Sequence, residues 1–313
     1  MRYCLSCYEP LTNGGHDFHE ACSRRMFGSA LPPDMPYSES DLEPLARQII
    51  QSRMAVTGVQ PKISLDVSGN DRSGHPRRFT MVGLWGGYIL KPPTTDYPQL
   101  PEVEDLTMHL AQLAGIRTAA HSLIRLKSGS MAYLSKRMDR TREGKLAMED
   151  MCQLTERLTE DKYHGSYEQI GKAVRMYSSN PGLDLVVFFE TLLFCFLTGN
   201  ADMNLKKFSL LEQPGVGMVL SPAYDLVNTA LVNPADKEDL ALTLNGRKRR
   251  IVRRDFTAAM DSQRLSARQQ QNIFDNMARA MPRWMQRIDI SFLSDGYKKS
   301  YKAILTERAG RVL

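Results

Sequence analysis

Two aspartates end neighbouring short segments in the second half of the chain: Asp202 closes Gly199-Asn-Ala-Asp202, and Asp225 closes Ala223-Tyr-Asp225. An aspartate just after a buried helix can orient an attacking hydroxyl, and a second one further along can hold the magnesium ion that bridges the phosphates of a nucleotide. The order of the pair and its separation of 23 positions fit this chemistry. Aspartates in turns also act as caps or form Asx-turns, so the pair alone leaves a structural role open.

A lysine and a glutamate in the first half of the chain could complete such a site. Lys91 ends an expected strand, and Glu104 lies in the first turn of an expected helix. In protein kinases a helix glutamate pairs with a strand lysine and aims its ammonium at the α- and β-phosphates. The alternatives are a solvated lysine and a glutamate stabilised only by the helix dipole.

A loop before the first expected strand could cover phosphates. Its sequence is Val56-Thr-Gly-Val-Gln-Pro-Lys62. The glycine and the small residues around it would let backbone amides approach a phosphate group. A single glycine before a strand is also an ordinary turn signal, so this loop is weak evidence by itself.

Three of the five cysteines lie in the first 22 residues, where they form a Cys-x2-Cys-x11-His-x2-Cys pattern: Cys4, Cys7, His19 and Cys22. Four sulfur and nitrogen ligands predict a closed, tetrahedral and structural zinc site. The alternative is a reduced cysteine cluster packed on the first lobe. The other two cysteines, Cys152 and Cys195, lie in apolar helical contexts and are predicted to be inert core residues.

The elements that must position these residues change in character near residue 150. Expected strands before it are Ile63–Val67, Phe79–Leu84, Tyr88–Lys91, Ser122–Leu126 and Met131–Ser135, with one helix over Val103–Ala114. Expected helices after it are Met148–Leu158, Tyr167–Tyr177, Leu183–Thr198, Phe256–Gln263, Ala267–Met281 and Leu293–Glu307, with a hairpin of Phe208–Glu212 and Gly217–Leu220.

This order predicts an α+β, two-lobed protein-kinase-like fold, with a sheet-rich N-lobe, a helical C-lobe and the nucleotide between them. The predicted parts are a zinc-knuckle-like segment over 1–28, the N-lobe over 29–140 and the C-lobe over 141–313.

Length and net charge restrict the possible functions of the chain only slightly. A chain of 313 residues can bury a sizeable core, and its net charge of +6 favours acidic partners such as nucleotides without requiring them. The longest apolar run, residues 185–197, contains Glu190 and is too short to span a bilayer. The N-terminus lacks a signal-peptide pattern. These features predict a soluble, cytoplasmic protein that does not associate with membranes.

Seven motifs taken together resemble one known family. They are Thr57-Gly-Val-Gln-Pro-Lys62, Ile89-Leu-Lys91, Leu100-Pro-Glu-Val-Glu104, Ala132-Tyr-Leu-Ser-Lys-Arg-Met-Asp-Arg140, Met148-Glu-Asp-Met-Cys-Gln153, Gly199-Asn-Ala-Asp202 and Ala223-Tyr-Asp225. From about residue 50 to its end the sequence is similar to the HipA-type toxin kinases of bacterial toxin–antitoxin systems. It resembles most their short, HipT-like form, in which the kinase core lacks a small N-terminal subdomain.

The resemblance implies a role for each matching residue. Asp202 would orient or deprotonate the acceptor hydroxyl, Asp225 would bind Mg²⁺, and Lys91, supported by Glu104, would hold the phosphates of ATP. Residues 134–137 would form the hinge that meets adenine. The implied nucleotide-binding residues are Val56, Thr57, Gly58, Val59, Gln60, Lys62, Lys91, Leu134, Ser135, Lys136, Asn204, Lys207 and Asp225.

The chain also departs from the family pattern. The family usually has histidine two positions and asparagine five positions after the catalytic aspartate, whereas this chain has Asn204 and Lys207. A protonated lysine cannot coordinate magnesium, which puts a second metal site in doubt. The family's usual loop serine is replaced by Ala55, which leaves Thr57 as the candidate autophosphorylation site. The zinc-knuckle-like start is a further departure.

The resemblance implies an ATP- and Mg²⁺-dependent serine/threonine protein kinase that acts as a toxin, with an aminoacyl-tRNA synthetase as the substrate class. The implied partners are a helix-turn-helix antitoxin, a small subdomain-like protein and, only indirectly, DNA. Two alternatives stay open. Lys207 favours a nucleotide-binding pseudokinase that regulates an antitoxin complex, and the N-terminal ligands with the basic balance favour a zinc-ribbon nucleic-acid adaptor.

Overall fold

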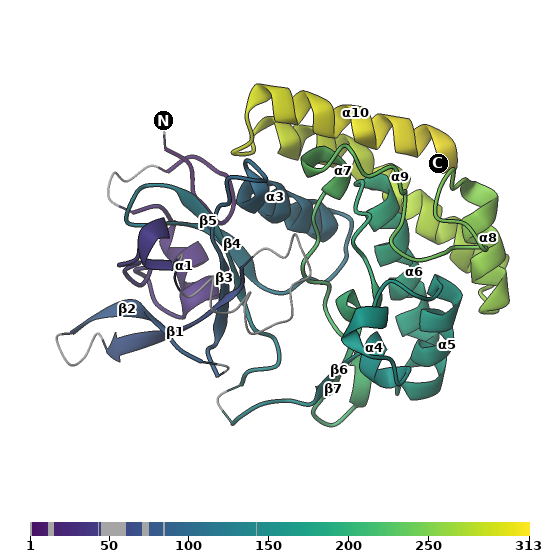
Figure 1. The fold of residues 1–313 in the computed structure, drawn as a ribbon, viewed down its shortest axis with the longest axis horizontal. Helices are drawn as coiled ribbons and strands as arrows, with labels where there is room; N and C mark the ends of the chain where they lie inside the picture. Colours follow the sequence, from purple (N-terminus) through teal and green to yellow (C-terminus); the bar gives the residue numbers. More distant parts are fainter. Residues whose placement is uncertain are drawn as a thin grey trace. The chain divides into compact units, whose positions relative to one another are not determined.

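The computed structural model (Figure 1) describes residues 2–11, 16–42, 44, 61–70, 75–83, 85–141 and 143–313. The chain divides into two compact units. One unit holds Met1–Asp105 and Ala119–Met138, and the other holds Leu106–Thr118 and Asp139–Leu313. The sequence predicted boundaries at residues 28/29 and 140/141, and it contained no sign that residues 106–118 group with the helical unit.

The first unit is built on a five-stranded antiparallel sheet with strand order β2-β1-β3-β5-β4. Its strands are β1 (Ile63–Asn70), β2 (His75–Met81), β3 (Tyr88–Lys91), β4 (His121–Arg125) and β5 (Met131–Lys136). The β3 strand has the predicted bounds, whereas β2 begins four residues earlier than predicted because its first residue, His75, pairs with Asn70 of β1.

Helix α1 (Glu20–Phe27) packs on this sheet through aromatic side chains. The ring of Phe27 lies 5.9 Å from that of Phe79 on β2, and Phe79 in turn meets Tyr88 on β3 at 5.4 Å. The Tyr88 hydroxyl donates to the carbonyl of Met26 at 3.1 Å. The N-terminal segment is therefore part of the core of this unit. Helix α3 (Leu100–Leu113) carries Glu104.

The second unit is built around helix α6 (Pro181–Leu197), in which every residue from Thr191 to Leu197 is buried. Apart from Asp184 and Glu190 its sequence is largely apolar, which is typical of a helix in a core. The other helices are α4 (Met151–Leu154), α5 (Tyr167–Tyr177), α7 (Thr229–Val232), α8 (Arg253–Ser262), α9 (Ala267–Asp289) and α10 (Asp295–Val312). Two short 3₁₀ turns, η2 (Thr159–Asp161) and η3 (Leu205–Lys207), and a three-stranded sheet of β6 (Met148–Asp150), β7 (Ser209–Gln213) and β8 (Gly217–Leu220) complete it.

The helix predicted over residues 148–158 is wrong. Met148 and Glu149 pair with Leu211 and Leu210 of β7, so the segment begins as strand β6. Asp150 then caps the single turn of α4: its carboxylate accepts from the Gln153 amide at 3.0 Å, and the Gln153 side chain accepts from the Asp150 amide at 2.9 Å.

Helix α9 continues eight residues beyond its predicted end and passes through Pro282. The extension is held by Trp284, which is fully buried and whose indole N–H donates to the Leu110 carbonyl at 2.8 Å. Tertiary contacts therefore override the helix-ending tendency of proline. Among the described residues, no helix combines the length and the apolar character that crossing a bilayer requires.

Candidate active site

Asp202 lies on a short loop directly after the buried helix α6. Gly199 turns the chain with φ +73°, and a Cβ atom there would lie 2.7 Å from Asn228 Oδ1, so glycine is needed on both grounds. The Ala201 amide donates to Thr229 Oγ1 at 2.7 Å, and Thr229 Oγ1 donates to the Gly199 carbonyl at 3.1 Å. The loop is thus fixed at both ends.

The Asp202 carboxylate is partly open to solvent, with 38% of the side chain exposed. Its Oδ1 atom accepts from the Tyr163 hydroxyl at 2.5 Å and from Asn204 Nδ2 at 3.2 Å. Burial, and after it the nearby Asp202 carboxylate, raise the pKa of the Tyr163 phenol, which therefore stays protonated as a donor. A carboxylate that accepts hydrogen bonds and still reaches solvent can serve as a base for a hydroxyl group.

Asp225 has a left-handed backbone, with φ +60°, which is uncommon for a residue that is not glycine. Such conformations cost about 1–3 kcal/mol and cluster at functional sites. Its side chain is largely buried and forms an ion pair with the ammonium of Lys207. The Lys207 Nζ atom also lies 3.4 Å from Asp202 Oδ2. One cation therefore joins the two aspartates that the sequence singled out.

Neighbouring contacts hold Lys207 in this place. Asn204 caps η3, because its Oδ1 accepts from the Lys206 amide at 3.0 Å. The Tyr224 hydroxyl donates to the Lys206 carbonyl at 3.0 Å. The Lys206 Nζ atom lies 2.6 Å from Asp150 Oδ2, so the two adjacent lysines form ion pairs with different carboxylates.

In the first unit, Lys91 and Glu104 form the predicted pair. Lys91 Nζ lies 2.5 Å from Glu104 Oε1, and the two side chains are 5% and 1% exposed. The ammonium also lies 5.4 Å from the centre of the Tyr133 ring on β5. A buried ion pair at the end of a strand is costly in free energy unless it is well satisfied, which makes a functional role a stronger explanation than stability alone.

Comparison with known proteins decides the family. A family model described as the HipA-like C-terminal domain matches residues 54–285, well over half of the 313 residues. The chain belongs to the HipA family. The resemblance inferred from the seven motifs is therefore confirmed.

Two curated relatives show how far the likeness extends. "Putative kinase Y4dM" of Sinorhizobium fredii is 32% identical over 214 residues, which make up 64% of this chain and 50% of that protein. The serine/threonine-protein kinase toxin HipA of Shewanella oneidensis is 27% identical over 213 residues, 62% of this chain and 47% of that protein. The chain spans about half the length of these relatives.

Solved structures agree on the fold. The HipA of Shewanella oneidensis, solved in complex with HipB and operator DNA, matches with a TM-score of 0.67 at 23% identity, covering 85% of this chain and 70% of that chain. The proinflammatory kinase CtkA of Helicobacter pylori matches with a TM-score of 0.53 at 15% identity, covering 72% and 87%. The predicted kinase-like α+β fold is confirmed.

The residues predicted to form the adenine hinge lie at the end of strand β5 and just after it. Residues 134–136 belong to β5, which pairs with β3 on one side and β4 on the other, and Leu134 is fully buried. The amide of Lys136 donates to the Ala120 carbonyl and that of Arg137 to the Gly87 carbonyl, both at 2.8 Å. These two amides are already used by the protein, so an adenine contact through them remains only a prediction.

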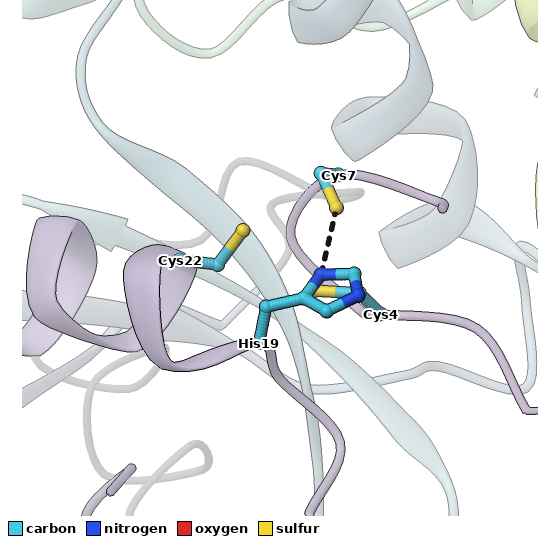
Figure 2. A group of neighbouring side chains, drawn as sticks. All are labelled: Cys4, Cys7, His19 and Cys22. Atoms are coloured by element: carbon cyan, nitrogen blue, oxygen red, sulfur yellow. Dashed lines mark hydrogen bonds between the residues drawn. The ribbon is translucent and has the colours of Figure 1, made fainter. Parts of the chain in front are cut away.

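Other predicted residues divide into three groups. The loop residues 55–60, with Thr57 and Gly58, lie outside the described residues. Lys62 is half-buried just before β1. The four predicted metal ligands come together: their ligand atoms all lie within 4.8 Å of one another (Figure 2).

Sequence reasoning missed Tyr163. It lies 39 positions before Asp202, between η2 and α5, in a segment with no periodic pattern. Nothing in the local sequence distinguishes this tyrosine from the eleven others in the chain. Only the fold brings its hydroxyl to the aspartate.

Proposed function

We propose that this chain is an ATP- and Mg²⁺-dependent serine/threonine protein kinase that acts as the toxin of a toxin–antitoxin system. Membership of the HipA family and the kinase fold support this proposal. The observation that carries it is the joining of Asp202 and Asp225 by one cation, because phosphoryl transfer needs positive charge between a hydroxyl-orienting carboxylate and a metal-binding one.

Each residue has a defined task in this proposal. Asp202 would accept the proton of a serine or threonine hydroxyl as that oxygen bonds to the γ-phosphorus and the bond from this phosphorus to the leaving ADP oxygen breaks. Lys91, held by Glu104, would bind phosphate oxygens of ATP. Carboxylates are suitable ligands for Mg²⁺, so Asp225 fits as its holder, and a bound Mg²⁺ would neutralise phosphate charge. Most of the rate gain would come from positioning and electrostatic stabilisation.

Lys207 would replace a second metal ion. It stands where the family pattern has a metal-binding asparagine, and its ammonium supplies a fixed positive charge to the same two carboxylates. The enzyme would then need only one Mg²⁺ per transfer.

We expect Lys207→Met to lower the transfer rate by about 10²-fold, because it removes a preorganised charge. Lys207→Asn should recover part of the rate at high Mg²⁺, since its amide oxygen can bind a second ion. The measurement is the initial rate of phosphorylation across a Mg²⁺ titration. Lys206→Met is the matched control, because that lysine pairs with Asp150, and it should leave the Mg²⁺ dependence unchanged.

The second candidate function is a pseudokinase that binds nucleotide and regulates an antitoxin complex. The ion pair between Lys207 and Asp225 favours it, because the lysine competes with Mg²⁺ for the carboxylate. An inactive natural chain together with an active Lys207→Asn variant would establish this function instead. A separate zinc-ribbon adaptor has less support, since the Leu5 carbonyl accepts from the Leu123 amide of β4 and ties the N-terminal segment to the sheet.

The substrate and partners follow from the family and are part of the proposal: an aminoacyl-tRNA synthetase as substrate, a helix-turn-helix antitoxin, a small subdomain-like protein, and DNA contacted only through the antitoxin. Autophosphorylation at Thr57 would regulate the enzyme, because a phosphate there adds nearly two negative charges to the loop.

The first test is intact-protein mass spectrometry of dephosphorylated chain incubated with ATP and Mg²⁺. A mass gain of one phosphate, mapped to Thr57, is the expected result. A gain at another site would support the kinase proposal but exclude Thr57 as the autophosphorylation site. No gain in the chain or in added synthetases would contradict the kinase proposal.

A further inference from the structure

The four side chains of the N-terminal Cys/His cluster lie close to one another (Figure 2). Cys4 and Cys7 flank a tight turn, His19 immediately precedes α1, and Cys22 lies in the first turn of that helix. Zinc–sulfur bonds of about 2.3 Å place the sulfurs of one site about 3.8 Å apart. Ligand atoms that all lie within 4.8 Å of one another are close to that arrangement.

The surroundings of the cluster suit a metal ion as well. His19 Nδ1 lies 3.4 Å from Cys7 Sγ, while Nε2 on the other side of the ring lies 3.1 Å from the Pro10 carbonyl. Donation from Nε2–H to that carbonyl fixes the tautomer in which Nδ1 presents its lone pair to the cluster. Three thiolates and Zn²⁺ carry a net charge of −1, and the Arg25 guanidinium lies 3.9 Å from Cys22 Sγ.

Tyr8, directly after the second cysteine, connects the cluster to the kinase residues. Its backbone is left-handed, with φ +66°, a conformation that glycine adopts without strain. A tyrosine at this position indicates that its side chain is needed. Its hydroxyl donates to Asp105 Oδ2 at 2.7 Å, and Asp105 Oδ1 lies 2.7 Å from His121 Nδ1. Tyr8 and Asp105 are buried, and Asp105 is adjacent in sequence to Glu104.

We propose that Cys4, Cys7, His19 and Cys22 bind one structural zinc ion, and that this ion holds Tyr8 against Asp105 and so fixes the start of α3, where Glu104 pairs with Lys91. The metal site stands independently of the proposed function. The expected effect on Lys91 depends on the proposed function only in the experiment that measures nucleotide binding.

Metal content of the full-length chain tests the first half. We expect about one zinc per chain by elemental analysis, loss of zinc in Cys22→Ser, and retention in Cys152→Ser, which alters a cysteine outside the cluster. Metal-free chain refilled with Co²⁺ should give the visible bands of a tetrahedral sulfur-rich site. Purified chain without zinc that also fails to take up Co²⁺ would overturn the metal site, even if Cys22→Ser does not fold.

The second half is tested with Tyr8→Phe, which removes only the hydroxyl. We expect this variant to keep its zinc, to exchange the amides of residues 100–108 about tenfold faster, and to bind a non-hydrolysable ATP analogue several-fold more weakly. Tyr3→Phe alters an exposed tyrosine near the cluster and is the control. Equal amide exchange in the two variants would overturn the coupling. Faster amide exchange in Tyr8→Phe would support the coupling of Tyr8 to α3. If no chain binds the nucleotide analogue as well, the coupling stands and the proposed kinase function is rejected.

A second inference rests on the hydrogen bond between Tyr163 and Asp202. The hydroxyl lies 2.5 Å from Oδ1, where the proposed reaction places the hydroxyl of an acceptor. The Lys162 carbonyl accepts from the Leu205 amide at 3.1 Å, so the backbone beside Tyr163 is anchored. Tyr163 is 39% exposed as a residue, so its side chain has room to leave by rotation.

We infer that Tyr163 stands in for the acceptor hydroxyl and keeps an attacking water from Oδ1 of Asp202 until a protein substrate displaces it; this inference rests on the proposed function. Without Tyr163, a water oxygen would bond to the γ-phosphorus, the bond to the ADP oxygen would break, and the water proton would pass to Asp202.

Tyr163→Phe should therefore raise phosphate release from ATP about tenfold in the absence of acceptor, relative to autophosphorylation of the same sample. Tyr177→Phe, an exposed tyrosine on α5, should not change this ratio. An unchanged or lower ratio in Tyr163→Phe would overturn the inference while autophosphorylation still supports the kinase. Neither hydrolysis nor transfer in any chain would overturn both.

Discussion

We expect the replacement of Asp202 by alanine to abolish the proposed phosphoryl transfer while the chain stays folded. The side chain is 38% exposed and lies on a loop whose backbone is held by Thr229 and Asn200, so its removal costs little stability. Loss of a positioned general base lowers a rate by about 10²–10⁴-fold. We expect an effect near the upper end, because in the proposed mechanism Asp202 would both orient the acceptor and receive its proton.

The measurement is phosphate incorporation by mass spectrometry, combined with a thermal unfolding curve for each variant. Asp236→Ala, which removes an exposed aspartate, serves as the matched control. Asp202→Asn separates shape from charge and should be nearly as inactive as the alanine variant. Transfer at the natural rate by a folded Asp202→Ala chain would show that another residue is the base.

The second large effect concerns the buried pair in the first unit. Lys91→Met removes the ammonium and leaves the carboxylate of Glu104 in a site where it is only 1% exposed. Breaking one side of a buried ion pair costs about 3–5 kcal/mol. The variant should therefore lose both phosphate binding and a large part of its free energy of unfolding.

The double variant Lys91→Met/Glu104→Gln separates the two losses. A neutral amide removes most of the cost of the buried charge, so we expect stability to return in urea unfolding while ATP binding and transfer stay absent. Lys127→Met, at an exposed lysine of the same unit, should change the free energy of unfolding by less than about 0.5 kcal/mol. Transfer by the double variant would show that Lys91 is structural.

Local patterns in the sequence were enough to predict several elements. Helix α5 has its predicted bounds, because Ser166 and Gln169 form a capping box ahead of an amphipathic run. The strand β6 could not be found in this way, since it depends on pairing with β7, some 60 residues later. The extension of α9 past Pro282 depends on a hydrogen bond from Trp284 to a carbonyl 174 positions earlier.

The same distinction holds for the site. Asp202, Asp225 and the Lys91–Glu104 pair carry recognisable residue types at recognisable places, and the sequence predicted them. The contacts of Lys207 with both aspartates depend on the left-handed turn at Asp225 and on the cap at Asn204. The contact from Tyr163 requires two loops that are separate in sequence to meet.

Thr229 links the two segments that carry Asp202 and Asp225. Its hydroxyl accepts from the Ala201 amide and donates to the Gly199 carbonyl, and the Ala230 amide donates to that same carbonyl at 3.0 Å. Hydrogen bonds of Thr229 and Ala230 therefore hold the loop that ends in Asp202 against the segment that follows Asp225. A displacement of either segment would shift both carboxylates together.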